Sequence, residues 1–305
     1  MEKTVLMPSI KLMKSWRKNK MNLLKEKIEA HQFVVTVELD PPKSASPAKT
    51  ESEIIKIAHY IDAVNVADCP MAKLRMSPIA LASIIQRKYK VESIFHLTCH
   101  DRNVIGLQAE LLGAAALGVH NILTLTGDAP SIGDHPAAKG VFEVDSSGLV
   151  EIAHTLTLGY DMAGNQLEVP ADFYIGTTAN PDAPDIDQEL KRLEKKKKAG
   201  AQFAQTQPIY EINRAEEFLK GTKEIGLPVL FGIVPLKSAK MARYFNTNVP
   251  GVHVPDSIVN AMEYGGRETG LRIAKDTITA LKELQSDGAH LMPVNDIDAA
   301  LYILQ

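Results

Sequence analysis

The sequence is poor in cysteine, with only Cys69 and Cys99 among its 305 residues. Neither cysteine belongs to a CxxC motif or stands beside a histidine, so we predict neither a disulfide framework nor a zinc site. Cysteine usage of this kind is typical of a reducing compartment, and we expect the protein to be cytoplasmic.

Long apolar runs and a strong charge imbalance are also missing. No uninterrupted apolar stretch reaches the roughly 20 residues that cross a bilayer, so we expect no membrane span. The formal net charge is −3, which gives no general attraction to nucleic acid or anionic lipid. With 45% hydrophobic and 23% charged residues, the composition is that of an ordinary soluble globular enzyme.

Several catalytic signatures are absent as well. The sequence has no nucleophile elbow with a paired His and Asp, and no His or Asp cluster at metal-ligand spacing, so we predict no metal site. It also lacks a GxGxxG turn after a strand and a Walker loop. If the protein carries out redox chemistry, its cofactor is therefore held by something other than a Rossmann fingerprint.

Strand and helix patterns alternate along the chain with a period of roughly 30 residues, the spacing of βα units in a barrel. The predicted strands are 33–39, 63–68, 93–98, 121–126, 173–176, 203–207, 229–233 and 290–292. The predicted helices are 23–31, 53–61, 78–90, 104–117, 148–158, 186–199, 214–223, 239–245 and 256–284. This order predicts an α/β protein with a single (β/α)8 TIM barrel over residues 23–305.

Residues 1–22 precede the first predicted helix and are interpreted as an N-terminal arm. They carry early basic residues but lack the apolar core and small-residue cleavage site of a signal peptide. Apolar side chains in the arm are suited to packing on the barrel or on a partner, and packing on the arm's own domain is favoured.

The first strong strand is a dense β-branched and aromatic run that ends at Pro41-Pro42, which is typical of a buried parallel strand. Glu38 is its last side chain. At such a position a carboxylate either emerges into solvent or sits in a pocket, where burial would raise its pKa toward neutrality and make it a general acid. The run alone favours the solvated strand end.

Polar residues end most of the other strands too. The set comprises Glu38, Asn65, His96, Asp128, Asn180 and Gln207. Barrel enzymes build their sites at the carboxyl ends of strands, and this composition is suited to binding a heteroaromatic ring system. The alternative is that the chain merely leaves the core at these points, where polar residues are expected in any case.

Four motifs resemble methylenetetrahydrofolate reductases in their order and intervals, over about residues 33–292. They are Val37-Glu38-Leu39-Asp40-Pro41-Pro42, His96-Leu97-Thr98-Cys99, Leu125-Thr126-Gly127-Asp128, and Ala199-Gly200-Ala201 leading to Gln205-Thr206-Gln207. Two further segments resemble the branch found in acetogens and in fusions with homocysteine methyltransferase domains. They are Gly133-Asp134 through Val144-Asp145-Ser146, and Asn248-Val249-Pro250-Gly251-Val252.

The resemblance implies a flavoprotein barrel that reduces 5,10-methylenetetrahydrofolate to 5-methyltetrahydrofolate by a ping-pong mechanism. The implied cofactor is FAD, with FMN as the alternative, and electrons come from NAD(P)H directly or through a partner subunit. The implied setting is one-carbon metabolism and methionine biosynthesis. We expect a homo-oligomer or a complex with an accessory subunit, and the arm is a plausible docking element.

By resemblance, Glu38 matches the general acid that protonates N10, Asp128 the carboxylate beside the flavin, and Gln207 the amide that orients pterin and nicotinamide. The positions that match flavin contacts are Asn65, His96, Leu125, Thr126, Asp128, Phe142, Asn180, Glu189, Arg192, Lys195 and Lys196. The chemistry of the residues agrees, because ring opening needs one protonated and one ionised carboxyl group.

The lysine run 195–198 has two interpretations. Most charge runs are solvated helix faces, which the run alone favours. Arg192, Lys195 and Lys196 lie on adjoining helical faces, however, and could gather around a diphosphate while the next two lysines face water.

The sequence departs from the common bacterial form at two places. Ala239 stands where that form has a phenylalanine over nicotinamide or folate, so we consider Tyr210 as the substrate-stacking ring. Asn295-Asp296 stands where that form has an arginine near the folate tail.

Two rival functions agree less well with these residues. A related flavin barrel that oxidises an amine such as proline is disfavoured by the HLTC and TGD motifs. A non-catalytic folate-binding or scaffold subunit is disfavoured because Glu38, Asp128 and Gln207 are all present.

Overall fold

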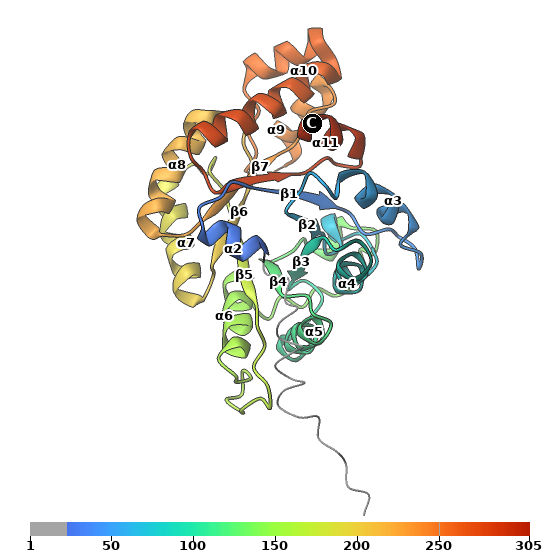
Figure 1. The fold of residues 1–305 in the computed structure, drawn as a ribbon, viewed down its shortest axis with the longest axis vertical. Coiled ribbons are helices and arrows are strands. Elements are labelled where there is room, and N and C mark those ends of the chain that lie inside the picture. The colour runs from blue at the N-terminus through green and yellow to red at the C-terminus, as the bar shows by residue number, and fades with distance from the viewer. Residues whose placement is uncertain (1–22, 250) are drawn as a thin grey trace, which may run out of the picture.

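Eight parallel strands close into a barrel with helices packed around its outside (Figure 1). The computed structural model describes residues 23–249 and 251–305, so the predicted arm lies outside the described residues. Each strand pairs with the next in the sequence, and β8 returns to pair with β1. The predicted (β/α)8 barrel is confirmed.

The elements follow the expected alternation. The strands are β1 Val34–Leu39, β2 Ala63–Val66, β3 Glu92–Thr98, β4 Asn121–Leu125, β5 Tyr174–Ala179, β6 Phe203–Pro208, β7 Val229–Ile233 and β8 Gly288–Leu291. The α-helices are α2 Leu23–Glu29, α3 Ala48–Ile57, α4 Pro78–Tyr89, α5 Val104–Ala116, α6 Ser146–Thr157, α7 Ile186–Ala199, α8 Ile212–Ile225, α9 Ala239–Asn248, α10 Asp256–Glu283 and α11 Ile297–Leu304. Short 3₁₀ turns, η2 Pro70–Ala72 and η3 Pro130–Ile132, lie in the loops after β2 and β4.

Two helices differ from the prediction. Helix α3 begins directly after Pro47 and ends at Ile57, earlier than the apolar spacing suggested. Helix α11 was not predicted; its first turn is capped by Asp296, whose carboxylate accepts a hydrogen bond from the Ala299 amide. None of the helices among the described residues is long and apolar enough to span a bilayer.

The barrel interior is apolar at its amino end. Helix α2 covers this end in Figure 1, and its Leu24 and Ile28 pack with inward side chains of the strands. The rings of Tyr174 and Phe203 stack there with centroids 4.8 Å apart. Gly176 leaves room for this stack, since a Cβ on it would lie 2.4 Å from Phe203 Cζ.

Inward side chains become polar toward the carboxyl end of the barrel. Successive residues of a strand point to opposite faces, so Val34, Thr36 and Glu38 follow one another up the inner side of β1. Because Val34 belongs to the apolar inner cluster and Glu38 lines a cavity, β1 spans from the closed amino end to the open site.

Candidate active site

A cavity of about 230 Å³ opens at the carboxyl ends of the strands. Of the predicted site residues, it brings together Glu38, His96, Leu125, Asp128 and Gln207. These residues come from four strands and the loop after β4, so barrel closure is what unites them. The solvated strand end that the first strand alone favoured is therefore not the arrangement found for Glu38.

Glu38 faces two histidines across the cavity. Its Oε2 lies 3.6 Å from Nε2 of His290 and 4.0 Å from Nε2 of His96. Burial raises the pKa of Glu38, but the contact with His290, together with the charges that His96 and His290 carry when they are protonated, outweighs burial and holds the pKa below its ordinary value. The expectation that the pocket raises this pKa is wrong, because the pocket is not apolar on the side of β8.

A polar floor lies beneath Glu38. It consists of Thr36, Asn65, His96, Gln205 and His290, all of which are buried. Thr36 Oγ1 lies 2.9 Å from His290 Nδ1 and accepts a hydrogen bond of 3.2 Å from Gln205 Nε2. The amides of Gln205 and Asn65 bond to each other in both directions, at 2.6 and 3.2 Å. A connected network of this kind fixes side-chain orientations in the barrel.

His96 belongs to the polar floor and also borders the cavity. Its Nε2 lies 2.9 Å from Asn65 Nδ2, which can only donate, so this ring nitrogen is the acceptor. Burial lowers the pKa of His96 to about 4, despite the opposing charge of Glu38. His96 is thus a neutral ring at neutral pH, and His290 is the nearer partner for the Glu38 carboxylate.

Asp128 is positioned by the loops after β2 and β4. Its Oδ2 accepts a hydrogen bond of 2.9 Å from the Met71 amide, and Met71 has a left-handed backbone with φ of +56°. Gly127 before it has φ of +85°, and a Cβ there would lie 2.5 Å from His100 Nδ1. Glycine is therefore required at position 127, which explains the turn that directs Asp128 to the cavity wall.

The two residues predicted to contact substrate lie at different depths. Gln207 is exposed at the cavity, as expected. Tyr210 is not among the cavity-lining residues; its ring packs with the cluster around Leu236, Ala239 and Ala242, and its hydroxyl donates to the Val234 carbonyl at 3.2 Å. Burial raises the pKa of Tyr210 well above its ordinary value. Its assignment to substrate stays a prediction.

The predicted flavin contacts after β4 lie on one loop system. Leu125 borders the cavity, and Thr126 Oγ1 accepts a hydrogen bond of 3.0 Å from the Ser146 amide at the start of α6. Phe142 is 40% exposed and has φ of +44°. An exposed aromatic ring held in an unusual backbone conformation is suited to contact a ligand.

A second group of predicted flavin contacts lies along α7. Glu189 accepts hydrogen bonds from the Asn180 amide at 3.0 Å and from Arg192 at 2.8 Å. Lys196 is buried, and its Nζ donates to the carbonyl of Thr178, a cavity residue, at 3.0 Å. Burial, followed by the charge of Arg192, lowers the pKa of Lys196 to about 8.

The rest of the lysine run follows the helical surface. Lys195, Lys197 and Lys198 are exposed. Lys198 pairs with Glu194 at 2.7 Å, and Lys197 donates to the Ile225 carbonyl. Lys196 alone of the run is turned inward, so the run is partly a solvated face and partly a buried cation.

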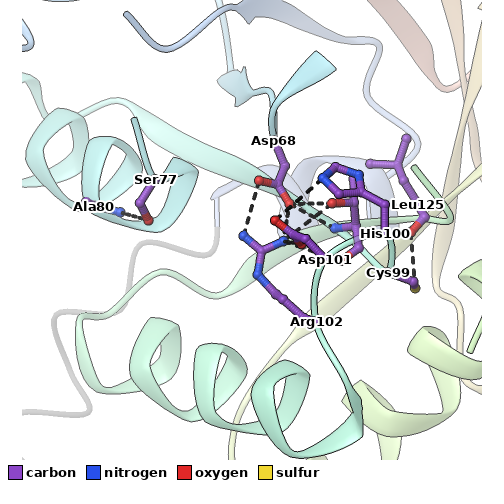
Figure 2. Close-up of polar contacts among 9 residues, drawn as sticks. Asp68, Ser77, Ala80, Cys99, His100, Asp101, Arg102 and Leu125 are labelled. Carbon is purple, nitrogen blue, oxygen red and sulfur yellow. Dashed lines mark hydrogen bonds and ion pairs between the residues drawn. The ribbon is translucent and has the colours of Figure 1, made fainter. Parts of the chain in front are cut away.

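The sequence did not indicate the ion pair between the buried Asp68 and the half-buried Arg102 (Figure 2). The pair is 2.8 Å apart, and Asp68 also accepts from the amide and hydroxyl of Thr98 at 3.0 and 2.8 Å. Asp68 and Thr98 both line the cavity. The pair therefore fastens the ends of β2 and β3 behind the cavity wall.

No group of three or more His, Cys, Asp or Glu side chains among the described residues could hold a metal ion. Some polar side chains of the cavity contact each other, as Asp68 does with Thr98 and Glu38 does with His290. Fold and site together define a (β/α)8 barrel protein with a carboxylate-bearing site at the carboxyl ends of its strands.

The chain belongs to the methylenetetrahydrofolate reductase family, because the family model "Methylenetetrahydrofolate reductase" matches residues 23–305. The match to this family agrees with the resemblance carried by the four sequence motifs. The match is to the family as a whole and does not separate the acetogen-like branch from other branches.

Curated relatives include methylenetetrahydrofolate reductase 1 of Schizosaccharomyces pombe, 24% identical over 249 residues, which cover 74% of this chain and 39% of that protein. A probable methylenetetrahydrofolate reductase (NADPH) of Caenorhabditis elegans is 24% identical over 263 residues, covering 82% and 38%. The chain thus spans about two fifths of the length of these relatives.

Among solved structures, an uncharacterized protein from Clostridium thermocellum that binds two copies of 5-methyl-5,6,7,8-tetrahydrofolic acid superimposes with a TM-score of 0.67. It is 17% identical, and the match covers 93% of this chain and 98% of that one. A 2,3-dimethylmalate lyase also matches, with a TM-score of 0.53, 11% identity and coverage of 91% and 81%. At such identities the two structures support the barrel fold alone.

Proposed function

We propose that this chain is the catalytic barrel of a flavin-dependent methylenetetrahydrofolate reductase, which reduces 5,10-methylenetetrahydrofolate to 5-methyltetrahydrofolate. The observation that carries the proposal is the meeting of Glu38, Asp128 and Gln207 at one cavity. Family membership supports it, and so does the folate bound by the structurally similar C. thermocellum protein.

The residues present fit a flavin. Leu123, Leu125 and Met292 supply apolar wall on which a planar ring can lie, while Gln207 and Thr178 supply polar groups at its edge. Lys196 and Arg192 are the cations that we assign to the diphosphate. When bound, the flavin supplies the hydride chemistry that amino-acid side chains lack. We propose FAD, with FMN as the alternative.

Glu38 is assigned the delivery of a proton to folate N10, which opens the five-membered ring. Because Glu38 is held as a carboxylate, the proton has to reach it first: in the proposed step a proton passes from His290 Nε2 to Glu38 Oε2, 3.6 Å away, and from Glu38 to N10, so that His290 is left neutral and the N10 bond to the bridging carbon breaks. Thr36 Oγ1 holds the His290 ring from below, and Gln205 in turn donates a hydrogen bond to Thr36.

The other two side chains act without transferring protons. The charge of Asp128 favours the cationic iminium that ring opening creates. Gln207 is assigned hydrogen bonds that orient the pterin, and the nicotinamide in the other half-reaction, because its amide can both donate and accept.

The finer features of the proposal follow the resemblance. We propose the acetogen-like branch, electrons from NAD(P)H directly or through an accessory subunit, and a role in one-carbon metabolism that serves methionine biosynthesis. We also propose that the protein acts in the cytoplasm, as a homo-oligomer or in a complex with that subunit. The names of relatives include both NADH and NADPH forms.

The test is an absorbance spectrum of the purified protein, followed anaerobically by NADH and then by methylenetetrahydrofolate. We expect flavin bands that bleach with NADH and return with the folate. Bands that bleach only with dithionite, yet return with the folate, indicate a partner as electron donor. A colourless protein that neither FAD nor FMN reconstitutes supports the non-catalytic folate-binding subunit instead.

Glu38→Gln separates the two half-reactions. The amide keeps the shape of the side chain but cannot deliver a proton, so we expect the folate half-reaction to slow by about 10²–10⁴-fold, the usual contribution of a general acid. Flavin reduction by NADH should persist, because it needs no proton at N10. Stopped-flow absorbance measures both rates, and equal rates in the variant and the parent would refute the assignment of Glu38.

A further inference from the structure

Helix α5 turns an apolar side away from the barrel. Its inner side carries Leu107, Leu111 and Ala114, which are buried. Its exposed residues lie on the opposite side and have no charged or polar side chain; they are Ile105, Ala109, Leu112, Gly113 and Ala116. We name these five residues the α5 face. A surface helix of a soluble protein usually turns charged and polar residues to this side, so an apolar face here indicates that another segment covers it.

The apolar surface continues from the α5 face onto the loop that follows α6. The Met162 amide donates to Gln108 Oε1 at 2.8 Å, which holds this loop against α5. Figure 1 shows α5, α6 and the loop together at the lower end of the molecule. The loop exposes four large apolar side chains, which are Leu158, Tyr160, Met162 and Val169. Exposed apolar side chains that gather in one region are typical of an interaction surface.

Acidic residues surround this apolar surface. Residues 103–172 include nine acidic residues but only one lysine or arginine, which is Lys139. Glu110 lies on α5, Glu151 on α6 and Glu168 on the loop, and none of the three forms an ion pair with another described residue. Two copies of this surface would place like charges against each other, which disfavours a second copy of the chain as the covering segment.

The N-terminal arm, residues 1–22, has the complementary composition. It contains six basic residues and a single acidic one, Glu2. Its large apolar residues are Val5, Leu6, Met7, Ile10, Leu12, Met13, Trp16 and Met21. A segment that combines basic and apolar side chains suits a surface that is apolar at its centre and acidic around it.

The arm joins the barrel on the same side as the α5 face. The Leu24 amide, in the first turn of α2, donates to Glu92 Oε2 at the start of β3 at 2.7 Å. The connections that follow β3 and β4 carry α5 and α6. Because barrel helices run antiparallel to the strands, the end of α5 lies at this amino end too. The 22 residues of the arm reach about 33 Å even if wound as a helix, whereas the 13 residues of α5 span about 20 Å.

We propose that residues 1–22 bind across the α5 face and the loop after α6 of their own chain. The apolar side chains of the arm cover Leu112 and its neighbours, and its basic side chains meet Glu110, Glu151 and Glu168. Covalent attachment favours this occupant, because a tethered segment is present at a high effective concentration that a separate partner has to overcome.

The test uses Trp16, the only tryptophan of the chain, whose fluorescence reports on the arm alone. Quenching by acrylamide is measured on the full-length protein, because acrylamide is uncharged and is not repelled by an acidic surface. Leu112→Lys places a cation on the α5 face, and Ile55→Lys is the matched control on an exposed apolar residue of α3. We expect Trp16 to be shielded in the parent and in Ile55→Lys. In Leu112→Lys the quenching constant should rise to that of a free synthetic peptide of residues 1–22.

Two further variants keep the test independent of any effect of Leu112→Lys on folding. Ile105 is 76% exposed, so Ile105→Lys leaves the core untouched and should also raise the quenching constant. Reversing two of the surrounding charges, with Glu110→Lys and Glu168→Lys together, should act in the same direction without removing an apolar contact. Circular dichroism of each variant shows that the barrel is folded.

The possible results separate the proposal from its alternatives. Shielding of Trp16 that is independent of protein concentration, and is lost in the α5 variants but not in Ile55→Lys, would support it. A parent in which Trp16 is quenched like the free peptide would overturn it, and so would equal shielding in the parent and all α5 variants. Shielding that grows with protein concentration, together with a dimer in sedimentation velocity, would instead assign the α5 face to a second copy of the chain.

Discussion

Replacing Thr36 by valine tests whether the polar floor holds the site together. Valine has nearly the same shape, but it removes the hydroxyl that lies 2.9 Å from His290 Nδ1 and 3.2 Å from Gln205 Nε2. Gln205 Nε2 keeps its bond to Asn65 Oδ1, whereas His290 Nδ1 loses its partner. Two lost hydrogen bonds, one of which leaves a buried nitrogen of His290 unsatisfied, lower the free energy of unfolding by about 2–4 kcal/mol.

Two assays measure the effect of Thr36→Val. Urea unfolding gives the shift in midpoint at constant slope, from which the change in free energy of unfolding follows. Stopped-flow kinetics should show a slower folate half-reaction, because a less constrained His290 resupplies the Glu38 proton less well, with flavin reduction unchanged. Thr36→Ser keeps the hydroxyl and should restore both the rate and the stability.

Thr177→Val is the matched control for Thr36→Val. Thr177 is also fully buried on a strand, but its hydroxyl has no hydrogen-bond partner among the described residues. Its loss should leave the free energy of unfolding unchanged or raise it, because an unsatisfied buried group is removed. If Thr36→Val proved as stable as Thr177→Val, the reasoning about the polar floor would be refuted.

Two pH predictions follow from buried ionisable groups. Burial raises the pKa of Glu92 to about 7, so its contribution to stability is intact below pH 4.5 and lost as the pH rises through 7. Glu92→Gln should therefore raise the free energy of unfolding at pH 8 by up to about 3 kcal/mol and change it little at pH 5. Urea titrations at the two pH values measure the effect, and an equal change at both would contradict this prediction. Burial lowers the pKa of Lys196 to about 8, so between about pH 8 and 10.5 this lysine is protonated in the unfolded chain and neutral in the folded one. The free energy of unfolding therefore rises with pH across that window, and Lys196→Met should flatten the rise. Flavin affinity of the parent, followed by fluorescence titration, should fall as the pH passes 8 and be pH-independent in Lys196→Met; a parallel fall in the variant would exclude Lys196 as a diphosphate ligand.

The sequence was sufficient for the barrel because local signals repeat in every unit. Asn103 caps the start of α5 and Gly200 the end of α7, and the predicted bounds of α7 agree with the structure. Helix α11 escaped prediction because it is short and lies beyond the last strand, where no further strand marks its end.

The site was only partly predictable. Glu38, Asp128 and Gln207 could be found because their motifs lie within short segments. The pKa of Glu38 could not, because it depends on the register that pairs Thr36 with His290 across β1 and β8. A signal for His290 was nevertheless present: His290 and Met292 occupy alternate positions of the last predicted strand, as inward residues of a barrel do.

The contact between Thr36 and His290 has a consequence for how the protein is made. The two residues are 254 positions apart, so a ribosome must extend the chain beyond β8 before the hydroxyl meets the ring. Contacts of such long sequence separation form late in folding, after the loop between them has been ordered. Recovery of folate turnover during refolding therefore reports the pairing of β8 with β1, which closes the barrel. A truncated or nascent chain that stops short of β8 cannot carry the assembled site.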